Sequence, residues 1–115
     1  MDRYREIGPL AVLDRDEMEF VQALPNKDKR DLIISGYIDF TLRRVMLFRG
    51  DGTSLMVSMV FFEPRPKLAP NFDEFSIIDH GLTLKFGEYE AAVDYVLYEH
   101  DPSYKVRDDA NRVTN

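Results

Sequence analysis

The stretch "RRVMLFRGDGTSLMVSMVFF", residues 43–62, decides the fold class of this chain. Two apolar runs flank the dipeptide Asp51-Gly52. Asp-Gly favours a type I′ turn, because such a turn requires positive φ at both central residues, and two β-rich runs joined in this way predict a β-hairpin. The register expected from this loop pairs Phe48 with Leu55, Met46 with Val57 and Arg49 with Ser54.

The same stretch contains the triplet Arg49-Gly50-Asp51, which is widely known as a cell-adhesion ligand. Gly50, Asp51 and Gly52 are residue types that a tight turn requires, so a turn accounts for the triplet without an adhesion role. A three-residue motif also recurs by chance in unrelated proteins. We therefore interpret the triplet as part of the turn.

The predicted hairpin is apolar on both faces, although a sheet in a small domain is usually covered on one face only. A second cover is therefore needed. Either N-terminal helices supply it, or a second copy of the chain does so in a homodimer, and the sequence leaves both alternatives open. The expected faces carry Met46, Phe48, Leu55, Val57, Met59 and Phe61 on one side and Val45, Leu47, Met56, Val60 and Phe62 on the other.

The N-terminal part predicts an extended segment followed by a helix. Residues 1–13 are expected to be extended. Asp14 with Glu17 forms a capping-box pattern and predicts a helix over residues 15–24, which Pro25 ends.

The next stretch is ambiguous, because residues 35–44 fit helical spacing and strand alternation equally well. Asp39 and Arg43 form an i,i+4 pair that favours a helix. The β-branched and aromatic content favours a strand. We predict a short helix over residues 27–34 and then a strand over 37–42.

Residues 63–70 are rich in Pro and predict a stiff connector. A second hairpin is expected over residues 75–86, with Asp79-His80-Gly81 as a three-residue loop. In that loop Gly81 suits the left-handed position.

The C-terminal part predicts a helix over residues 88–100, which Asp101-Pro102 ends, and a polar, frayed tail over 103–115. The whole chain, residues 1–115, is predicted to be a single α+β domain. The expected architecture has one or two short N-terminal helices, an antiparallel sheet of about four strands in two hairpins, and a C-terminal helix packed on the sheet.

Composition excludes several classes of function. The chain has no Cys, which excludes disulfides, a thiolate nucleophile and Cys-based metal sites. The start is rich in charge and is not typical of a signal peptide, and no apolar run approaches the ~20 residues that span a bilayer, so a cytoplasmic protein is expected. The net charge of −6 disfavours direct nucleic-acid binding. The basic residues that would carry such binding are Arg30, Arg43, Arg44 and Arg49.

No motif indicates a catalytic, metal or cofactor site. The two histidines, His80 and His100, lack recognised ligand spacing, so neither a metal nor a cofactor is expected. The acidic residues cluster at turns and helix ends, where solvation explains them, and no catalytic residue is assigned. The alternative hypothesis is a small enzyme or ligand-binding domain with a site between the C-terminal helix and the sheet, using His100, Asp101 or Asp79.

The strongest functional signal is an acidic surface over residues 71–101, which carry eight acidic residues and only one basic residue, Lys85. Solubility is one explanation of this charge. The other explanation is a surface that binds a basic protein partner, such as a nucleic-acid-binding protein. The tyrosines in this region favour an interface, since Tyr is enriched at protein interfaces. We expect a small non-enzymatic interaction protein of inhibitor, immunity-like, antitoxin-like or adaptor type, of bacterial or phage origin. Its predicted partner-binding residues are Glu90, Asp94, Tyr95, Tyr98 and Glu99.

Overall fold

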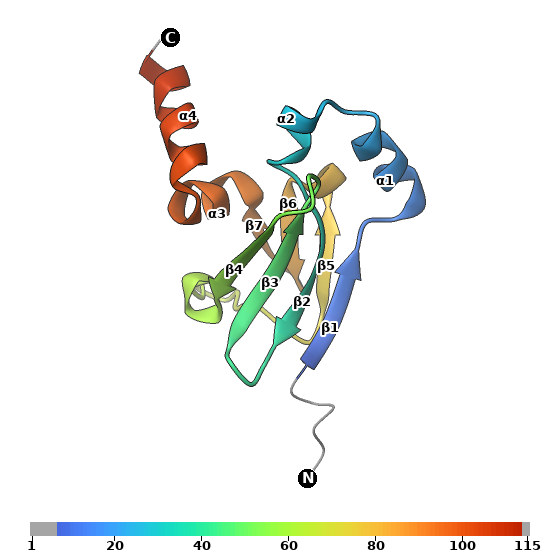
Figure 1. Cartoon of the computed structure of the whole chain (residues 1–115). Coiled ribbons are helices and arrows are strands. Elements are labelled where there is room, and N and C mark those ends of the chain that lie inside the picture. Colours follow the sequence, from blue (N-terminus) through green and yellow to red (C-terminus); the bar gives the residue numbers. More distant parts are fainter. Residues whose placement is uncertain (1–6, 114–115) are drawn as a thin grey trace.

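The computed structural model of the chain describes residues 7–113, which form an α+β structure (Figure 1). It contains a four-stranded antiparallel sheet of order β1-β2-β3-β4 and a three-stranded antiparallel sheet of order β5-β6-β7. The α+β class is confirmed, but the single sheet of about four strands that we predicted is replaced by two sheets. The strands are β1 (Ile7–Val12), β2 (Ile33–Asp39), β3 (Arg44–Arg49), β4 (Ser54–Ser58), β5 (Phe75–Ile78), β6 (Thr83–Phe86) and β7 (Tyr89–Ala92).

The helices lie at the ends and along one edge of the sheets (Figure 1). Helices α1 and α2 lie beyond one end of the four-stranded sheet, and α4 extends away from both sheets. No helix within residues 7–113 is long and apolar enough to cross a membrane. The helical elements are α1 (Arg15–Gln22), α2 (Asn26–Lys29), α3 (Val93–His100), α4 (Pro102–Val113) and the short 3₁₀ turns η2 (Met59–Phe61) and η3 (Asp79–Gly81).

The core lies between the two sheets, which stack with their apolar faces together (Figure 1). At Gly36 a Cβ would lie 2.6 Å from the carbonyl oxygen of Met46 and 3.3 Å from the ring of Phe75. The missing side chain therefore lets β2 and β5 approach closely. The buried residues of this layer are Ala11, Ile38, Val45, Leu47 and Val57 from one sheet and Phe75, Ile77, Leu84, Phe86, Tyr89 and Ala91 from the other.

The N-terminal predictions hold in outline. Asp14 Oδ1 accepts a hydrogen bond of 2.8 Å from the backbone N–H of Glu17, so the predicted N-cap is confirmed. Helix α1 ends two residues earlier than the predicted 15–24. Of the predicted extended segment, residues 7–12 form β1, and residues 1–6 lie outside the described part of the chain.

The ambiguous stretch is resolved in favour of a short helix followed by a strand, as predicted. The helix covers only residues 26–29, and the strand begins at Ile33 rather than at residue 37. Strand β2 lies between β1 and β3 and pairs with both. Pairing with two neighbouring strands stabilises the extended conformation of β2. This tertiary effect outweighs the local i,i+4 pair of Asp39 and Arg43, which favours a helix.

The β3–β4 hairpin forms as predicted, but its register differs by one residue. Val45 pairs with Val57 and Leu47 with Leu55, because the loop contains Gly50 as well as Asp51-Gly52. A one-residue slip exchanges the faces of one strand. As a consequence, the predicted division of the hairpin into two apolar faces is wrong, and β4 ends before Met59, where η2 begins.

The loop geometry explains the Arg49-Gly50-Asp51 triplet. Gly52 has φ +91°, the left-handed conformation that closes a three-residue loop. A Cβ at Gly50 would lie 2.6 Å from the carbonyl oxygen of Lys29. The Asp51 carboxylate accepts hydrogen bonds from the hydroxyl and backbone N–H of Thr53, and these bonds lower the pKa of Asp51. Each residue of the triplet is therefore used within the fold.

The second hairpin and the C-terminal part differ from the prediction in their boundaries. Ile78 pairs with Thr83, so four residues connect β5 and β6 instead of the predicted three, although Gly81 does adopt the left-handed conformation. The predicted helix over residues 88–100 is a strand followed by a helix. Strand β7 pairs with β6, and its side chains alternate between buried and exposed. The sequence did not distinguish the two structures, because Tyr89 fits the apolar stripe of a helix as well as the alternation of a strand.

The tail that was expected to fray contains helix α4, up to residue 113. Asp101 Oδ1 accepts a hydrogen bond of 2.9 Å from the backbone N–H of Ser103, and Pro102 follows as the first helical residue. An Asp-Pro pair ends one helix and also begins the next, since Pro suits the first helical position. Residues 114–115 lie outside the described part of the chain.

A partly buried ion cluster holds α4 against the rest of the fold. The Arg49 guanidinium lies 2.8 Å from Asp101 Oδ2 and 3.2 Å from Asp31 Oδ1, and it also donates to the carbonyl oxygen of Arg30. Asp31 in turn accepts two hydrogen bonds from Arg107 on α4, of 2.8 and 3.1 Å. The cluster thus joins β3, the segment after α2, and both C-terminal helices.

We predict that Arg49→Met lowers the free energy of unfolding by about 2–3 kcal/mol, because Asp31 and Asp101 lose a shared cation in a site with limited access to water. Arg43→Met is the matched control, since Arg43 lies in the turn just before β3 and its side chain is exposed, and its effect should stay within about 0.5 kcal/mol. Chemical denaturation of both variants measures this difference. Equal stabilities of the two variants would contradict it.

The same variant should change the pH dependence of stability. Burial raises the pKa of Asp101, but hydrogen bonds from Arg49 and from backbone N–H groups outweigh this and hold the pKa below 3.8. A depressed carboxylate pKa stabilises the fold above the unfolded pKa and loses this effect as the pH falls through the folded pKa. We therefore expect the stability difference between wild type and Arg49→Met to shrink below about pH 4, measured by denaturation at a series of pH values.

Candidate functional site

Helices α3 and α4 form the walls of a groove with a volume of about 450 Å³. The groove is lined by both apolar and polar surface, and its side chains come from the two helices and from the residue that precedes α3. These side chains are Ala92, Asp94, Tyr95, Tyr98, Glu99, Tyr104, Asp108 and Arg112. Four of the five predicted partner-binding residues therefore lie in one groove.

The position of α3 is fixed by its buried face. Val93, Val96 and Leu97 are almost completely buried against the sheets. The backbone N–H of Val93 also donates to the carbonyl oxygen of Leu82, which ties the start of the helix to the second hairpin. Because successive helical residues turn by 100°, this anchoring directs the opposite face of α3 toward the groove.

Two tyrosine hydroxyls join the walls of the groove. Tyr104 on α4 donates a hydrogen bond of 3.0 Å to Asp94 on α3. Tyr98 on α3 donates one of 2.9 Å to Asp109 on α4. Together with the Arg49 cluster, these reciprocal bonds set the distance and angle between the two helices.

These contacts keep both tyrosines neutral. Burial and the hydrogen bond to Asp94 raise the pKa of Tyr104 to about 12. The hydrogen bond to Asp109, with a smaller effect of burial, raises the pKa of Tyr98 above its ordinary value of 10.0. A neutral phenol with its hydroxyl engaged is not poised for acid–base chemistry at neutral pH. What these side chains offer instead is their aromatic faces.

The aromatic faces of the groove already receive cations from α4. Lys105 Nζ lies 5.3 Å and the Arg112 guanidinium 5.9 Å from the ring centre of Tyr98. The Arg107 guanidinium lies 5.4 Å from the ring centre of Tyr104. Cation–π attraction favours this arrangement. The groove thus presents Tyr rings beside carboxylates, a combination that suits Arg and Lys side chains.

The remaining predicted residue, Glu90, lies apart from the groove. It occupies an exposed position on β7, and its carbonyl oxygen accepts a hydrogen bond from Arg65. Sequence reasoning missed the α4 half of the groove because the tail was expected to fray. The Asp101-Pro102 pair, an N-cap followed by a first helical residue, was the signal that could have revealed α4.

An adjacent hollow continues from the groove across Tyr95. This hollow has a volume of about 340 Å³. The Tyr95 ring stacks on Phe61 at 5.1 Å between ring centres, so the exposed face of Tyr95 stands between the groove and the hollow. The hollow is lined by Phe61, Glu63, Pro64, Arg65, Tyr89 and Tyr95.

The residues of the alternative small-molecule site do not converge. His100 Nδ1 lies 2.8 Å from the carbonyl oxygen of Val96, and Asp101 is bound to Arg49. Asp79 lies in η3 and accepts a hydrogen bond from Thr83. The space between α3 and the sheets is filled by core side chains. Within residues 7–113, no group of three or more His, Asp or Glu side chains could hold a metal ion.

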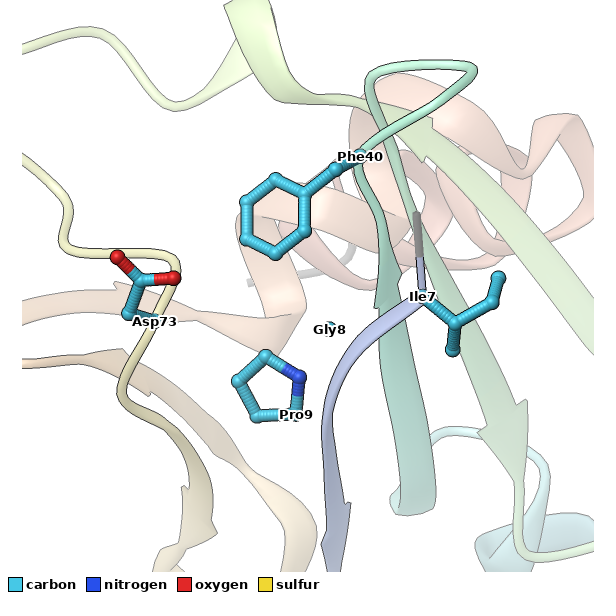
Figure 2. Close-up of a pocket in the computed structure, with 5 residues that line it drawn as sticks. All are labelled: Ile7, Gly8, Pro9, Phe40 and Asp73. Carbon is cyan, nitrogen blue, oxygen red and sulfur yellow. The ribbon is translucent and has the colours of Figure 1, made fainter. Parts of the chain in front are cut away.

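A further hollow of about 420 Å³ lies beside β1 (Figure 2). Figure 2 shows Phe40 and Pro9 facing it, Asp73 at its side and Ile7 turned away. A Cβ at Gly8 would lie 2.3 Å from the Phe40 ring, so this ring packs directly on the backbone of β1. The lining brings a single carboxylate to apolar walls and offers no pair of groups for catalysis.

Two of the four arginines considered for nucleic-acid binding are held in ion pairs. Arg44 lies 3.2 Å from Asp39, and Arg49 belongs to the ion cluster. Paired arginines contribute little to a surface that must neutralise phosphates.

Comparison of the chain with known proteins gave no match. No protein-family model matches the chain significantly, and neither a curated protein nor a solved structure does so.

We predict that Asp94→Asn lowers the pKa of Tyr104 from about 12 toward 10, because the carboxylate that disfavours the phenolate is removed. NMR titration with ¹³C-labelled tyrosine rings measures this shift. Asp73→Asn is the control and should leave the Tyr104 titration unchanged, since Asp73 lies beside β1. An unchanged Tyr104 pKa in Asp94→Asn would show that the two helices are not joined as described.

Proposed function

We propose that this protein is a small, non-enzymatic interaction module that binds a basic segment of another protein in the groove between α3 and α4. The observation that carries the proposal is the convergence of Asp94, Tyr95, Tyr98 and Glu99 in one groove. Inhibitor, immunity-like, antitoxin-like and adaptor roles are each compatible with such a module, and the absence of Cys suits a cytoplasmic location.

The charge of the groove supports a basic partner. Arg112 lies 2.9 Å from Asp108, so these two side chains compensate each other. Asp94 and Glu99 have no cation within ion-pairing distance among the described residues and leave the groove negative. An Arg or Lys side chain that entered the groove would gain both carboxylates and the exposed ring of Tyr95.

Solubility explains dispersed surface charge, but it does not explain the association of charge with aromatic rings. Tyr95 is 57% exposed and lies on the outer face of α3. Tyr is enriched at protein interfaces because its ring buries a large area while its hydroxyl retains a polar contact. The exposed ring therefore favours binding over solubility as the role of this surface.

We predict that the triple variant Glu90→Lys, Asp94→Lys and Glu99→Lys loses capture of its protein partner while retaining the fold. Affinity capture from the host lysate with the full chain as bait, followed by mass spectrometry, identifies a stoichiometric partner. The reversals at Asp94 and Glu99 replace attraction by repulsion toward a basic segment in the groove, and Glu90→Lys adds a reversal on β7, outside the groove. Circular dichroism and thermal unfolding check that the fold is intact.

The matched control reverses three acidic residues elsewhere, with Asp73→Lys, Glu74→Lys and Glu88→Lys. All three are exposed, and none lines the groove. The net charge changes equally in both variants, so a general electrostatic effect would weaken capture in both. The proposal requires that only the variant with Glu90→Lys, Asp94→Lys and Glu99→Lys loses partner capture. Undiminished capture by this variant in its folded state would refute the proposal.

A further inference from the structure

The outer face of the four-stranded sheet is apolar and forms a surface of its own. The strand register places one row of side chains across all four strands and a second row beside it. We call this surface the open face. The first row is Leu10, Tyr37, Met46 and Met56, and the second is Val12, Ser35, Phe48 and Ser54.

The open face has no cover among the described residues. Figure 1 shows the four-stranded sheet in front of the three-stranded sheet, with no helix crossing its outer side. Leu10 is 67% exposed, Val12 55% and Met56 53%, while Tyr37, Met46 and Phe48 are half-buried. An apolar patch of this kind on a small protein marks an interaction site.

The outer face of the three-stranded sheet shows the usual pattern instead. It carries polar side chains such as Ser76, Thr83, Lys85 and Glu90. Antiparallel sheets ordinarily alternate apolar residues toward the core with polar residues toward water. The two outer faces of one molecule therefore differ, and the difference assigns the apolar one to a contact.

The N-terminal helices do not provide this contact. The Phe20 ring of α1 lies 4.7 Å from the ring of His80 in η3, so α1 packs beside the second hairpin. Helix α2 packs on the β3–β4 loop, where Gly50 approaches Lys29. The sequence allowed two covers for the hairpin, the N-terminal helices or a second copy of the chain. Since the helices lie elsewhere, the second copy is the remaining one of these two.

We propose that the open face binds the open face of a second copy of this chain, forming a symmetric homodimer. The charge of the face argues for this occupant. Its only charged side chains in the described strands are Asp39 and Arg44, at one end, and they lie 3.2 Å from each other. When two copies of a chain with net charge −6 meet, a neutral face adds no like-charge contacts to their overall repulsion.

The arrangement of the side chains also fits a two-fold axis parallel to the strands. Such an axis sets β1 of one copy over β4 of the other, so that Leu10 meets the partner's Met56. By the same register, Tyr37 lies over the partner's Met46 and Phe48 lies over the partner's Ser35, so the rings of both copies, 6.2 Å apart between centres within each copy, gather beside the axis. Aligned sheets pack in this way at a separation of about 10 Å.

The size of the face predicts a reversible dimer. Four strands about 4.8 Å apart and five residues long cover roughly 300 Å² per copy. Two such faces bury less than a standard interface of about 1,600 Å². Because each copy closes its own core between its two sheets, the monomer stays folded when the dimer dissociates.

Dimerisation leaves the α3–α4 groove free, since no groove residue belongs to the open face. If the proposed function of the groove holds, the dimer presents two grooves and can bind a partner with two basic segments more tightly than a monomer can. This consequence rests on the proposed function, whereas the dimer itself does not.

The test is sedimentation velocity of the full chain from low micromolar to millimolar concentration. The mass should rise with concentration from 13.4 kDa toward twice that value. The double variant Leu10→Lys and Met56→Lys should stay monomeric, with a dissociation constant raised by roughly a hundredfold or more, because lysines would be buried in an apolar contact. Both positions are exposed in the monomer, so the fold is kept.

The control variant Ser76→Lys and Leu82→Lys adds the same charge and also removes an exposed apolar side chain, outside the open face. It should dimerise as the wild type does. NMR signals of the Tyr37 and Phe48 rings should shift with concentration in the wild type. A wild type that is monomeric throughout, a Leu10→Lys and Met56→Lys variant that still dimerises, or shifts that map to another surface would each overturn the proposal. None of these readouts depends on partner capture, so the dimer and the proposed function fail independently.

Discussion

The position of α4 relative to α3 depends on the Arg49 guanidinium, which lies between Asp31 and Asp101. The Arg49 side chain is only 11% exposed, and it belongs to the hairpin that organises the larger sheet. Asp101 stands at the corner between α3 and α4, and Asp31 extends the cluster to Arg107 on α4. Because a partly buried ion cluster gains less free energy than apolar packing of similar volume, its main effect is to select one arrangement of the helices. The α3–α4 groove exists because this arrangement is selected.

How far the sequence predicts this fold depends on whether a signal is local. The Asp14 cap and the Asp-Gly hairpin use contacts within a few residues, and both were predicted. The hairpin register was not, because the loop length is set by the contact of Gly50 with Lys29, which belongs to another element. The division of the hairpin into faces failed for the same reason, since a single-residue slip exchanges one strand's faces.

The C-terminal part shows a second kind of limit, in which one pattern satisfies two structures. Tyr89 fits the apolar stripe of a helix and also the alternation of a strand, and pairing with β6 decides between them. The sequence therefore predicted the α3 side of the groove but not the α4 side. Asp94, Tyr95, Tyr98 and Glu99 lie on the polar side of a helix that the sequence does indicate. Their counterparts on α4 depend on the Arg49 cluster, whose bonded pairs are 18 to 76 positions apart in the chain.

The groove and the open face divide the surface by charge. Carboxylates and tyrosines gather where α3 and α4 meet, while the open face is nearly free of charge. An uncovered apolar sheet face favours non-specific association, which a net charge of −6 opposes. The same charge also opposes the approach of a second copy, so the proposed dimer depends on an open face that adds no further like-charge repulsion. Under the two proposals the acidic composition serves both surfaces: it supplies the attraction for a basic segment in the groove and restricts the open face to an uncharged partner surface.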